Sequence, residues 1–310
     1  MKQSLLNDAL FRRAFIVSAV IGILVRFIVL RITDKQYPSR PQDYLEQIIM
    51  SGLAASLGAI AFPALIDKEF SALTFFAVAI QQFQGVASQE RITLKNIDEN
   101  ELVPKGAAYI EEIASTYEVR SYISLFASLG ASVIYIFLAR RYKLEAIWCA
   151  LAATVIGIII GLIFRRYLRR NSLGDIADVV EAKITFEESA LLVNEVFINN
   201  IGLEATRKRY IEDGLAVEII PKNMGDFGVI SDVGQREAIL HNIYLHLGIN
   251  KDVDEVDIIA TSKTDLNKNT IVIPFIPILK DIELMKEVIK STPIIEASKN
   301  KQSAYKRKTS

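Results

Sequence analysis

The sequence has few of the residues that build a disulfide framework or a metal centre. Its 310 residues include one cysteine, Cys149, and two histidines, His241 and His246. A single cysteine excludes an internal disulfide and a thiolate metal site. The two histidines fall on one predicted helix, about 140° out of phase, so they do not converge on one metal ion. The residues therefore predict no metal site and no cofactor.

The sequence also lacks a net charge, and it lacks the short motifs that accompany common enzyme chemistries. No P-loop, GxGxxG, GxSxG or HExxH pattern occurs. The 36 basic residues are balanced by 36 acidic ones. The basic residues of the first half cluster beside apolar runs, where they govern membrane topology rather than nucleic-acid binding. We therefore predict a protein that is not an enzyme and has no nucleic-acid partner.

Apolar residues are abundant and lie mainly in the first half. Hydrophobic residues make up 51% of the chain, and the mean hydropathy is +0.28, which is typical of a membrane protein. About 20 apolar residues in a helix cross the ~30 Å hydrocarbon core. The sequence predicts an α-helical multi-span membrane domain over residues 1–170, with the lipid bilayer as a partner. Its four spans are expected at residues 14–32, 47–66, 122–139 and 144–164.

A fifth stretch, residues 70–86, is ambiguous. It begins as a membrane helix but then contains Gln81, Gln82 and Gln84, so it fits a re-entrant helix, an interfacial helix or a fifth span. Four spans place both the basic N-terminus and the cluster at 165–170 in the cytoplasm, as the positive-inside rule favours. We therefore expect a multi-pass cell-membrane protein with a cytoplasmic N-terminus and a cytoplasmic C-terminal domain.

Three residues inside the predicted spans stand out. Gly157 and Gly161 form a GxxxG pattern, which lets helix backbones approach closely. The pattern fits packing among the chain's own spans, and a homo-oligomer stays open. Arg26 is a candidate intramembrane charge, because burying a guanidinium in lipid is costly. Its alternative is a side chain that extends to the interface, since residue 32 ends the span.

After residue 170 the pattern changes to that of a soluble two-layer α/β domain, expected over residues 171–296. Its helices are predicted at 203–213, 234–248 and 281–291. Its strands are predicted at 182–186, 191–198, 215–220, 256–261 and 270–275. Residues 297–310 are polar and basic and are expected to form a disordered tail.

Residues 87–121 form a polar loop that includes a helix starting after Gly106, next to the third predicted span. On this helix Glu111, Ser115, Glu118 and Tyr122 share one face, while apolar residues that include Ile110, Ile113 and Ala114 share another. By periodicity alone, this is an amphipathic helix that leads into the span.

The same segment, "AAYIEEIASTYEVRSY", resembles the signature of the YIEGIA family of membrane proteins from endospore-forming bacteria. Further stretches in the family's order cover most of residues 70–295. Glu112 departs from the signature, because the family has a glycine there, and a glutamate makes a better helix. The matching positions are Tyr109, Ile110, Glu111, Ile113, Ala114, Glu118, Arg120 and Tyr122.

The resemblance implies a membrane region with a C-terminal soluble domain, a link to sporulation, and a small capping subunit as a partner. The favoured hypothesis is a component of a membrane complex, with the soluble domain and the YIEGIA-like helix as partner-binding surfaces. The second is an oligomeric channel or transporter subunit with Arg26, Glu111 and Arg120 near its pathway. The third is a membrane enzyme for lipid or cell-wall precursors that uses Glu111 and Glu118 as acid and base, although roughly 10 Å of helix rise separates them.

Overall fold

The computed structural model describes residues 9–33, 41–66, 70–101, 103–168, 171–252, 255–256, 258 and 260–299. The chain divides into two compact units. The helical unit comprises the described residues within 1–90 and 114–169, and the C-terminal unit those within 91–113 and 170–310. The boundary therefore passes through two helices, and residues 91–113 fold with the C-terminal domain.

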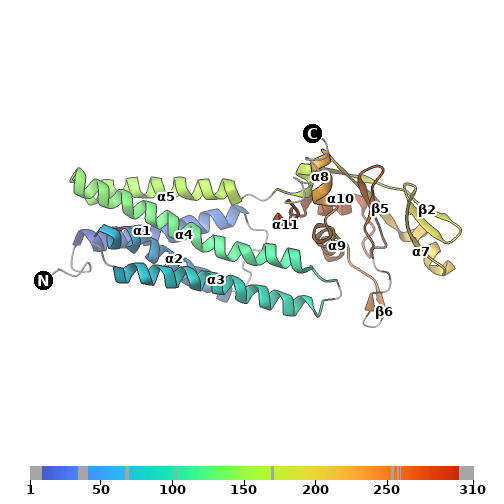
Figure 1. The fold of residues 1–310 in the computed structure, drawn as a ribbon, viewed down its shortest axis with the longest axis horizontal. Coiled ribbons are helices and arrows are strands. Elements are labelled where there is room, and N and C mark those ends of the chain that lie inside the picture. The colour runs from blue at the N-terminus through green and yellow to red at the C-terminus, as the bar shows by residue number, and fades with distance from the viewer. Residues whose placement is uncertain are drawn as a thin grey trace. The chain divides into compact units, whose positions relative to one another are not determined.

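Five helices supply the helical unit (Figure 1). They are α1 (Ala9–Thr33), α2 (Pro41–Ile66), α3 (Phe70–Asp98), α4 (Ala107–Arg141) and α5 (Ala146–Leu168). Three stretches among the described residues are long and apolar enough to cross a membrane: Gln47–Ile66, Ala107–Arg141 and Ala146–Arg166. The predicted span at 14–32 lies in α1, with side chains at its C-terminal end outside the described residues, and the ambiguous stretch at 70–86 lies in α3.

Helix α4 joins two segments that the sequence presented separately. The predicted amphipathic helix and the predicted span at 122–139 form one helix of 35 residues. Neither glycine nor proline interrupts residues 107–129, so no local signal breaks it. At 1.5 Å per residue α4 is about 52 Å long, well beyond the ~30 Å of a hydrocarbon core. Likewise, residues 87–98 continue α3 rather than forming a loop.

The C-terminal unit is built on a four-stranded antiparallel sheet in the order β1-β5-β9-β8. These strands are β1 (Ala177–Glu181), β5 (Leu215–Pro221), β9 (Thr270–Phe275) and β8 (Lys263–Asp265). A second antiparallel sheet contains β2 (Ile184–Glu187), β3 (Ala190–Val193) and β4 (Val196–Asn200), and β6 (Lys251–Asp252) pairs with β7 (Glu255–Val256). The helices are α6 (Leu173–Ile176), α7 (Glu204–Asp213), α8 (Met224–Ile230), α9 (Val233–Leu247), α10 (Ile282–Ser291) and α11 (Glu296–Lys299).

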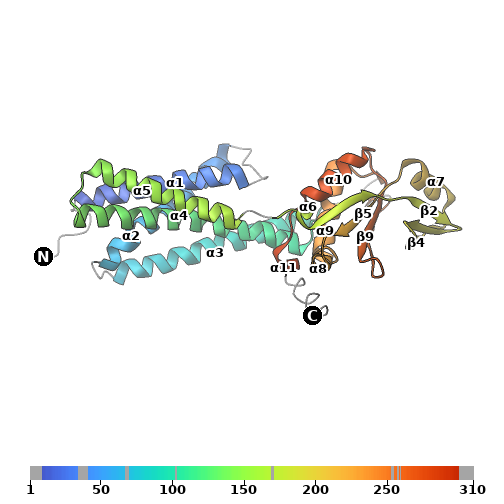
Figure 2. The same ribbon diagram turned by 90° about the horizontal axis from the view of Figure 1, so that it is seen from above.

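Both faces of the main sheet are covered. Val217 and Ile273 point into a core shared with α9 and α10, whereas Ala216 and Val272 point into a core shared with the second sheet and Tyr210 of α7. Every residue of β9 is buried. Figure 2 shows the main sheet between these helices and the second sheet. The C-terminal unit therefore has a helix layer and two sheet layers, and the predicted two layers describe only the helix-covered side.

Several predicted elements need correction. The strand expected at 191–198 is a hairpin, because Asn194 and Glu195 adopt positive φ angles of 45° and 70° and form a two-residue turn between β3 and β4. In the described part of 256–261 only Val256 belongs to a strand, β7, and β8 follows at 263–265. Residues 297–299, expected in a disordered tail, belong to α11, and Ser298 is buried. Residues 300–310 lie outside the described part.

Candidate functional site

The YIEGIA-like segment begins at a tight connection between α3 and α4. The Asp98 carboxylate accepts hydrogen bonds from the backbone N–H of Lys105 at 2.5 Å and of Gly106 at 3.2 Å. Gly106 has a φ of +83°, which favours glycine, and its carbonyl accepts the first helical bond of α4 from Ile110 N. A carboxylate also suits the positive end of a helix dipole. Asp98 thus fixes where the segment starts.

An aromatic contact packs the YIEGIA-like segment against α9. The ring of Tyr109 meets that of His241 edge to face, with centroids 6.4 Å apart. His241 is 7% exposed, and its Nδ1 lies 2.9 Å from the Val103 carbonyl oxygen. Because a carbonyl only accepts, this geometry requires the proton on Nδ1. His241 therefore fixes the residues that precede α4 as well as Tyr109.

Glu112, the departure from the family signature, faces inward. It is 9% exposed, and its Oε2 accepts a hydrogen bond from Glu296 N at 3.0 Å. Buried carboxylates need such partners. The chain around Glu296 is held further by α9, because Gln235 donates to Pro293 O at 3.1 Å and accepts from Ile295 N at 2.8 Å. The segment, α9 and the C-terminal end of the described chain thus form one junction.

The face predicted to contact a partner is largely used within the chain. Arg91 of α3 donates to both carboxylate oxygens of Glu111, at 2.5 and 2.7 Å. Tyr122 meets the ring of Phe83 of α3 edge to face at 6.4 Å. Ser115 and Arg120 are half-buried, and the side chain of Glu118 lies outside the described residues. Glu111 and Tyr122 therefore join α4 to α3.

The other signature residues are buried. Ile110 and Ile113 are 4% and 5% exposed, and Ala114 is fully buried. The unit boundary falls directly after Ile113. The signature thus belongs partly to the C-terminal unit and partly to the helical unit, within one continuous helix.

Arg26 and the GxxxG glycines lie in the helical unit, away from this junction in sequence. Arg26 is 2% exposed, and its Nη2 donates to Gln47 Oε1 of α2 at 2.5 Å. Gly157 and Gly161 are buried, and a Cβ at Gly157 would collide with Ile21 of α1. Arg26 and Gly157 therefore make contacts between helices of this chain.

Asp98, Gln235 and His241 were not predicted for the junction. Each binds backbone groups, 7 and 8 residues away for Asp98 and at least 58 residues away for Gln235 and His241, so no pattern of side chains marks these bonds in the sequence. Across the described part of the chain, no three His, Cys, Asp or Glu side chains gather closely enough to hold a metal ion. What the junction does chemically is to satisfy buried polar groups and fix backbone positions.

Comparison with known proteins assigns the chain to a family. The profile of the family described as "YIEGIA protein" matches residues 14–305. The chain is similar to the uncharacterized protein YphB of Bacillus subtilis (strain 168), with 32% identity over 281 residues, which is 91% of each chain. No solved structure matches.

Proposed function

The chain belongs to the YIEGIA family, and on this premise we propose that it is a membrane-anchored assembly protein whose C-terminal domain binds a protein partner. The partner class that the family resemblance implies is a small companion protein in the sporulating cell. The chain acts as a multi-pass membrane protein with its C-terminal domain in the cytoplasm, where Arg165 and Arg166 of α5 favour it.

One observation carries this proposal: the signature residues act as internal supports. Tyr109 contacts His241, and Glu112 bonds to Glu296 N, both within the C-terminal unit. The same helix then continues through the apolar stretch of α4. One continuous helix thus belongs to the soluble domain at one end and is suited to a membrane at the other, so it would anchor that domain to the membrane.

Helix α7 carries the surface we assign to the partner. Leu203, its N-cap residue, and Ile211, in its last turn, are 67% and 66% exposed. Tyr210 on the inner side is buried against the second sheet. Exposed aliphatic side chains are typical of protein contacts, since covering them removes apolar surface from water.

The test is co-purification from sporulating cells of an endospore-forming host. Full-length tagged protein should bring down a specific small protein after mild detergent extraction. Replacing Leu203→Ser together with Ile211→Ser should lower the recovery of that protein about tenfold, which corresponds to ~1.4 kcal/mol of binding free energy.

Leu245→Ser is the matched control, because Leu245 is also 67% exposed but lies on α9. It should leave recovery unchanged. Absence of any specific partner, or equal recovery with all three proteins, would contradict the proposal.

A further inference from the structure

Hydrogen bonds in the helical unit define the directions of α2 and α4. Ser128 Oγ donates to Ala55 O at 2.7 Å, and Ser132 Oγ donates to Ala59 O at 2.9 Å. An advance of four residues on α4 thus matches an advance of four on α2. The two helices run parallel, so if both cross the membrane they enter it from the same side.

A chain with two parallel crossings must return between them, and α3 is the segment available. Its 29 residues would extend about 43 Å, enough to cross. The ring contact of Phe83 with Tyr122 and the packing of Phe83 with Ala54 and Leu125 place α3 against α2 and α4. The helix directions therefore favour the fifth crossing that the composition of 70–86 left open.

A crossing by α3 brings a polar face to membrane depth. Phe83 and Ala87 are buried on the inner side of α3. The outer side exposes Gln81, Gln84, Gly85 and Ser88, at positions i, i+3, i+4 and i+7; we name these four residues the amide face. Gln81 follows the helix start by eleven residues, which places it about 16 Å into the crossing, near the middle of the bilayer. Exposing amide groups to lipid there is unfavourable.

We propose that the amide face binds the amide face of a second copy of this chain within the membrane. A glutamine side chain both donates and accepts hydrogen bonds, so two copies related by a two-fold axis satisfy each other. Gly85 has nothing within 4 Å of the position of a Cβ, which leaves room for a neighbouring backbone. Small residues beside hydrogen-bonding ones are the usual composition of such contacts.

The contact with Ile21 separates this surface from the GxxxG pattern. Gly157 is covered by α1 of the same chain, whereas Gly85 is open. The dimer surface therefore lies on α3, and the partner is chemically identical to the chain itself.

The first experiment is disulfide cross-linking of the full chain in membranes. Cys149→Ala removes the one native cysteine, which is buried. In this background Ser88→Cys should give a cross-linked dimer on mild oxidation. Thr154→Cys is the matched control, because Thr154 is exposed on α5 and also carries a hydroxyl, and it should stay monomeric. Cross-linking of both variants or of neither overturns the proposal.

The second experiment removes the amides. Gln81→Leu with Gln84→Leu should lower the dimer fraction, measured by light scattering in detergent, at least fivefold. Thr154→Leu should leave it unchanged. If lipid covers the amide face, the variant with Gln81→Leu and Gln84→Leu should have the same oligomeric state as the natural chain. That result would refute self-association through the amide face, whether or not the C-terminal domain binds a soluble partner.

Discussion

At the residue scale, Glu112 shows how one departure from a family signature acquires a structural task. A glycine at this position offers no side-chain acceptor, whereas the Glu112 carboxylate accepts from Glu296 N. Glu111, its neighbour in sequence, pairs with Arg91 at the surface, where the two side chains are 56% and 42% exposed. Glu112 is 9% exposed, so the interaction of its carboxylate matters more: a hydrogen bond to a charged group contributes about 1.5–3 kcal/mol, and a surface ion pair contributes about 0–1 kcal/mol.

Replacing Glu112→Ala should therefore destabilise the protein by about 1–3 kcal/mol and accelerate amide hydrogen exchange around residue 296. Glu112→Gln, which keeps an acceptor oxygen, should lose less. Glu111→Ala should cost under about 1 kcal/mol. Thermal unfolding and hydrogen exchange of the detergent-purified chain measure all three, and equal losses for the two alanine variants would show that the bond to Glu296 N is unimportant.

The junction could be predicted only in part, and the reason is visible at single residues. The resemblance identified Tyr109 and Glu111, but it did not say what they contact. Asp98 and Gln235 bind backbone groups. Almost any residue can supply such a group, so the partner residues cannot be recognised from their type in the sequence. Arg26 was found because charge inside an apolar run is rare, yet its bond to Gln47 depends on the packing of α1 against α2.

At the scale of elements, predictions succeeded where a glycine or proline marks the end of a helix or strand. The predicted helix at 203–213 matches α7 closely because Gly214 follows it, and the predicted strand at 215–220 matches β5, which ends at Pro221. The β3–β4 hairpin was missed because Asn194-Glu195 lacks the glycine that usually marks a two-residue turn. Nothing local indicates that Asn194 donates to the buried carboxylate of Glu218 on β5 at 2.7 Å and so ties the turn to the main sheet.

Helix α7 depends on Tyr210, which fills the core between α7 and the second sheet. Burial, reinforced by Tyr244 and opposed by Arg209, raises the pKa of Tyr210 to about 12. The folded state thus holds the proton above the ordinary pKa of about 10, where the unfolded chain loses it. This contribution to the free energy of unfolding is complete below pH ~10 and falls between pH ~10 and ~12.

Phenolate absorbance and unfolding measured against pH should show this loss, of order 2–3 kcal/mol by pH ~12. Tyr210→Phe cannot ionise, so its stability should fall less over the same range. A natural chain and a phenylalanine variant with parallel pH profiles would mean that ionisation of Tyr210 does not limit alkaline stability.

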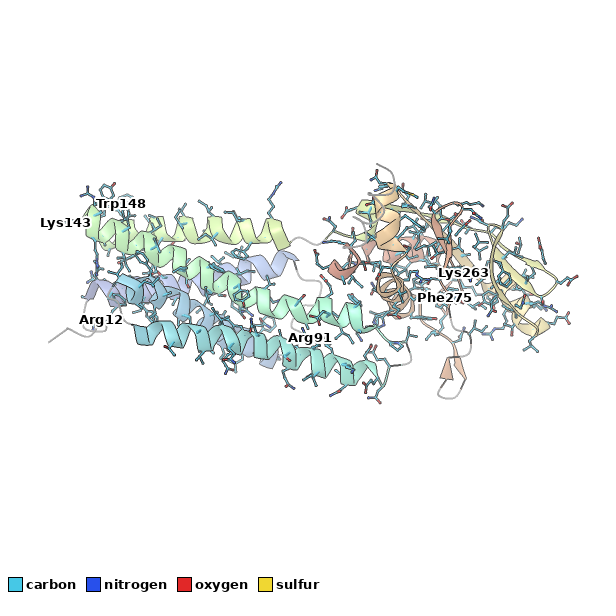
Figure 3. The ribbon with its side chains drawn as sticks, viewed as in Figure 1. Arg12, Arg91, Lys143, Trp148, Lys263 and Phe275 are labelled. Atoms are coloured by element: carbon cyan, nitrogen blue, oxygen red, sulfur yellow. The ribbon has the colours of Figure 1, made fainter. Side chains whose placement is uncertain are left out.

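At the scale of the whole molecule, the helix directions constrain where the chain enters and leaves the membrane. Gly22 of α1 lies against Ser124 of α4, and Arg12 near the start of α1 lies at the same end of the helical unit as Lys143 after the end of α4, so α1 and α4 run antiparallel (Figure 3). Phe126 stacks on Phe164, so α5 is antiparallel to α4 as well. Helices α1 and α5 therefore run parallel. Figure 3 places Arg12 at the same end of the helical unit as Lys143 and Trp148 of the α4–α5 turn.

As membrane crossings, parallel α1 and α5 would put the N-terminus and the exit of α5 on opposite sides of the membrane. We propose this arrangement as the alternative to the four predicted spans, which would place both in the cytoplasm. Residues 1–13, the α2–α3 loop and residues 140–145 carry 7 Lys and Arg residues, whereas the α1–α2 loop at 34–40, residues 87–121 and the exit at 165–170 carry 10. We propose on this basis that the exit of α5, and the domain that follows it, lie in the cytoplasm, as the positive-inside rule favours.

This topology predicts opposite labelling of two introduced cysteines in the Cys149→Ala background. Glu145→Cys in the α4–α5 turn should react with a membrane-impermeant maleimide in intact cells. Glu195→Cys, whose native side chain is 91% exposed in the C-terminal unit, should react only after permeabilisation.

Detergent-solubilised samples, in which both cysteines should react, control for burial of the introduced side chains. If both sites reacted equally, the chain would cross the membrane an even number of times between them, which contradicts α5 as a membrane helix. If Glu195→Cys reacted in intact cells and Glu145→Cys only after permeabilisation, the five crossings would hold but the C-terminal domain would lie outside the cell. The result thus decides which compartment supplies the partner of the C-terminal domain, because only a protein on the same side can reach α7.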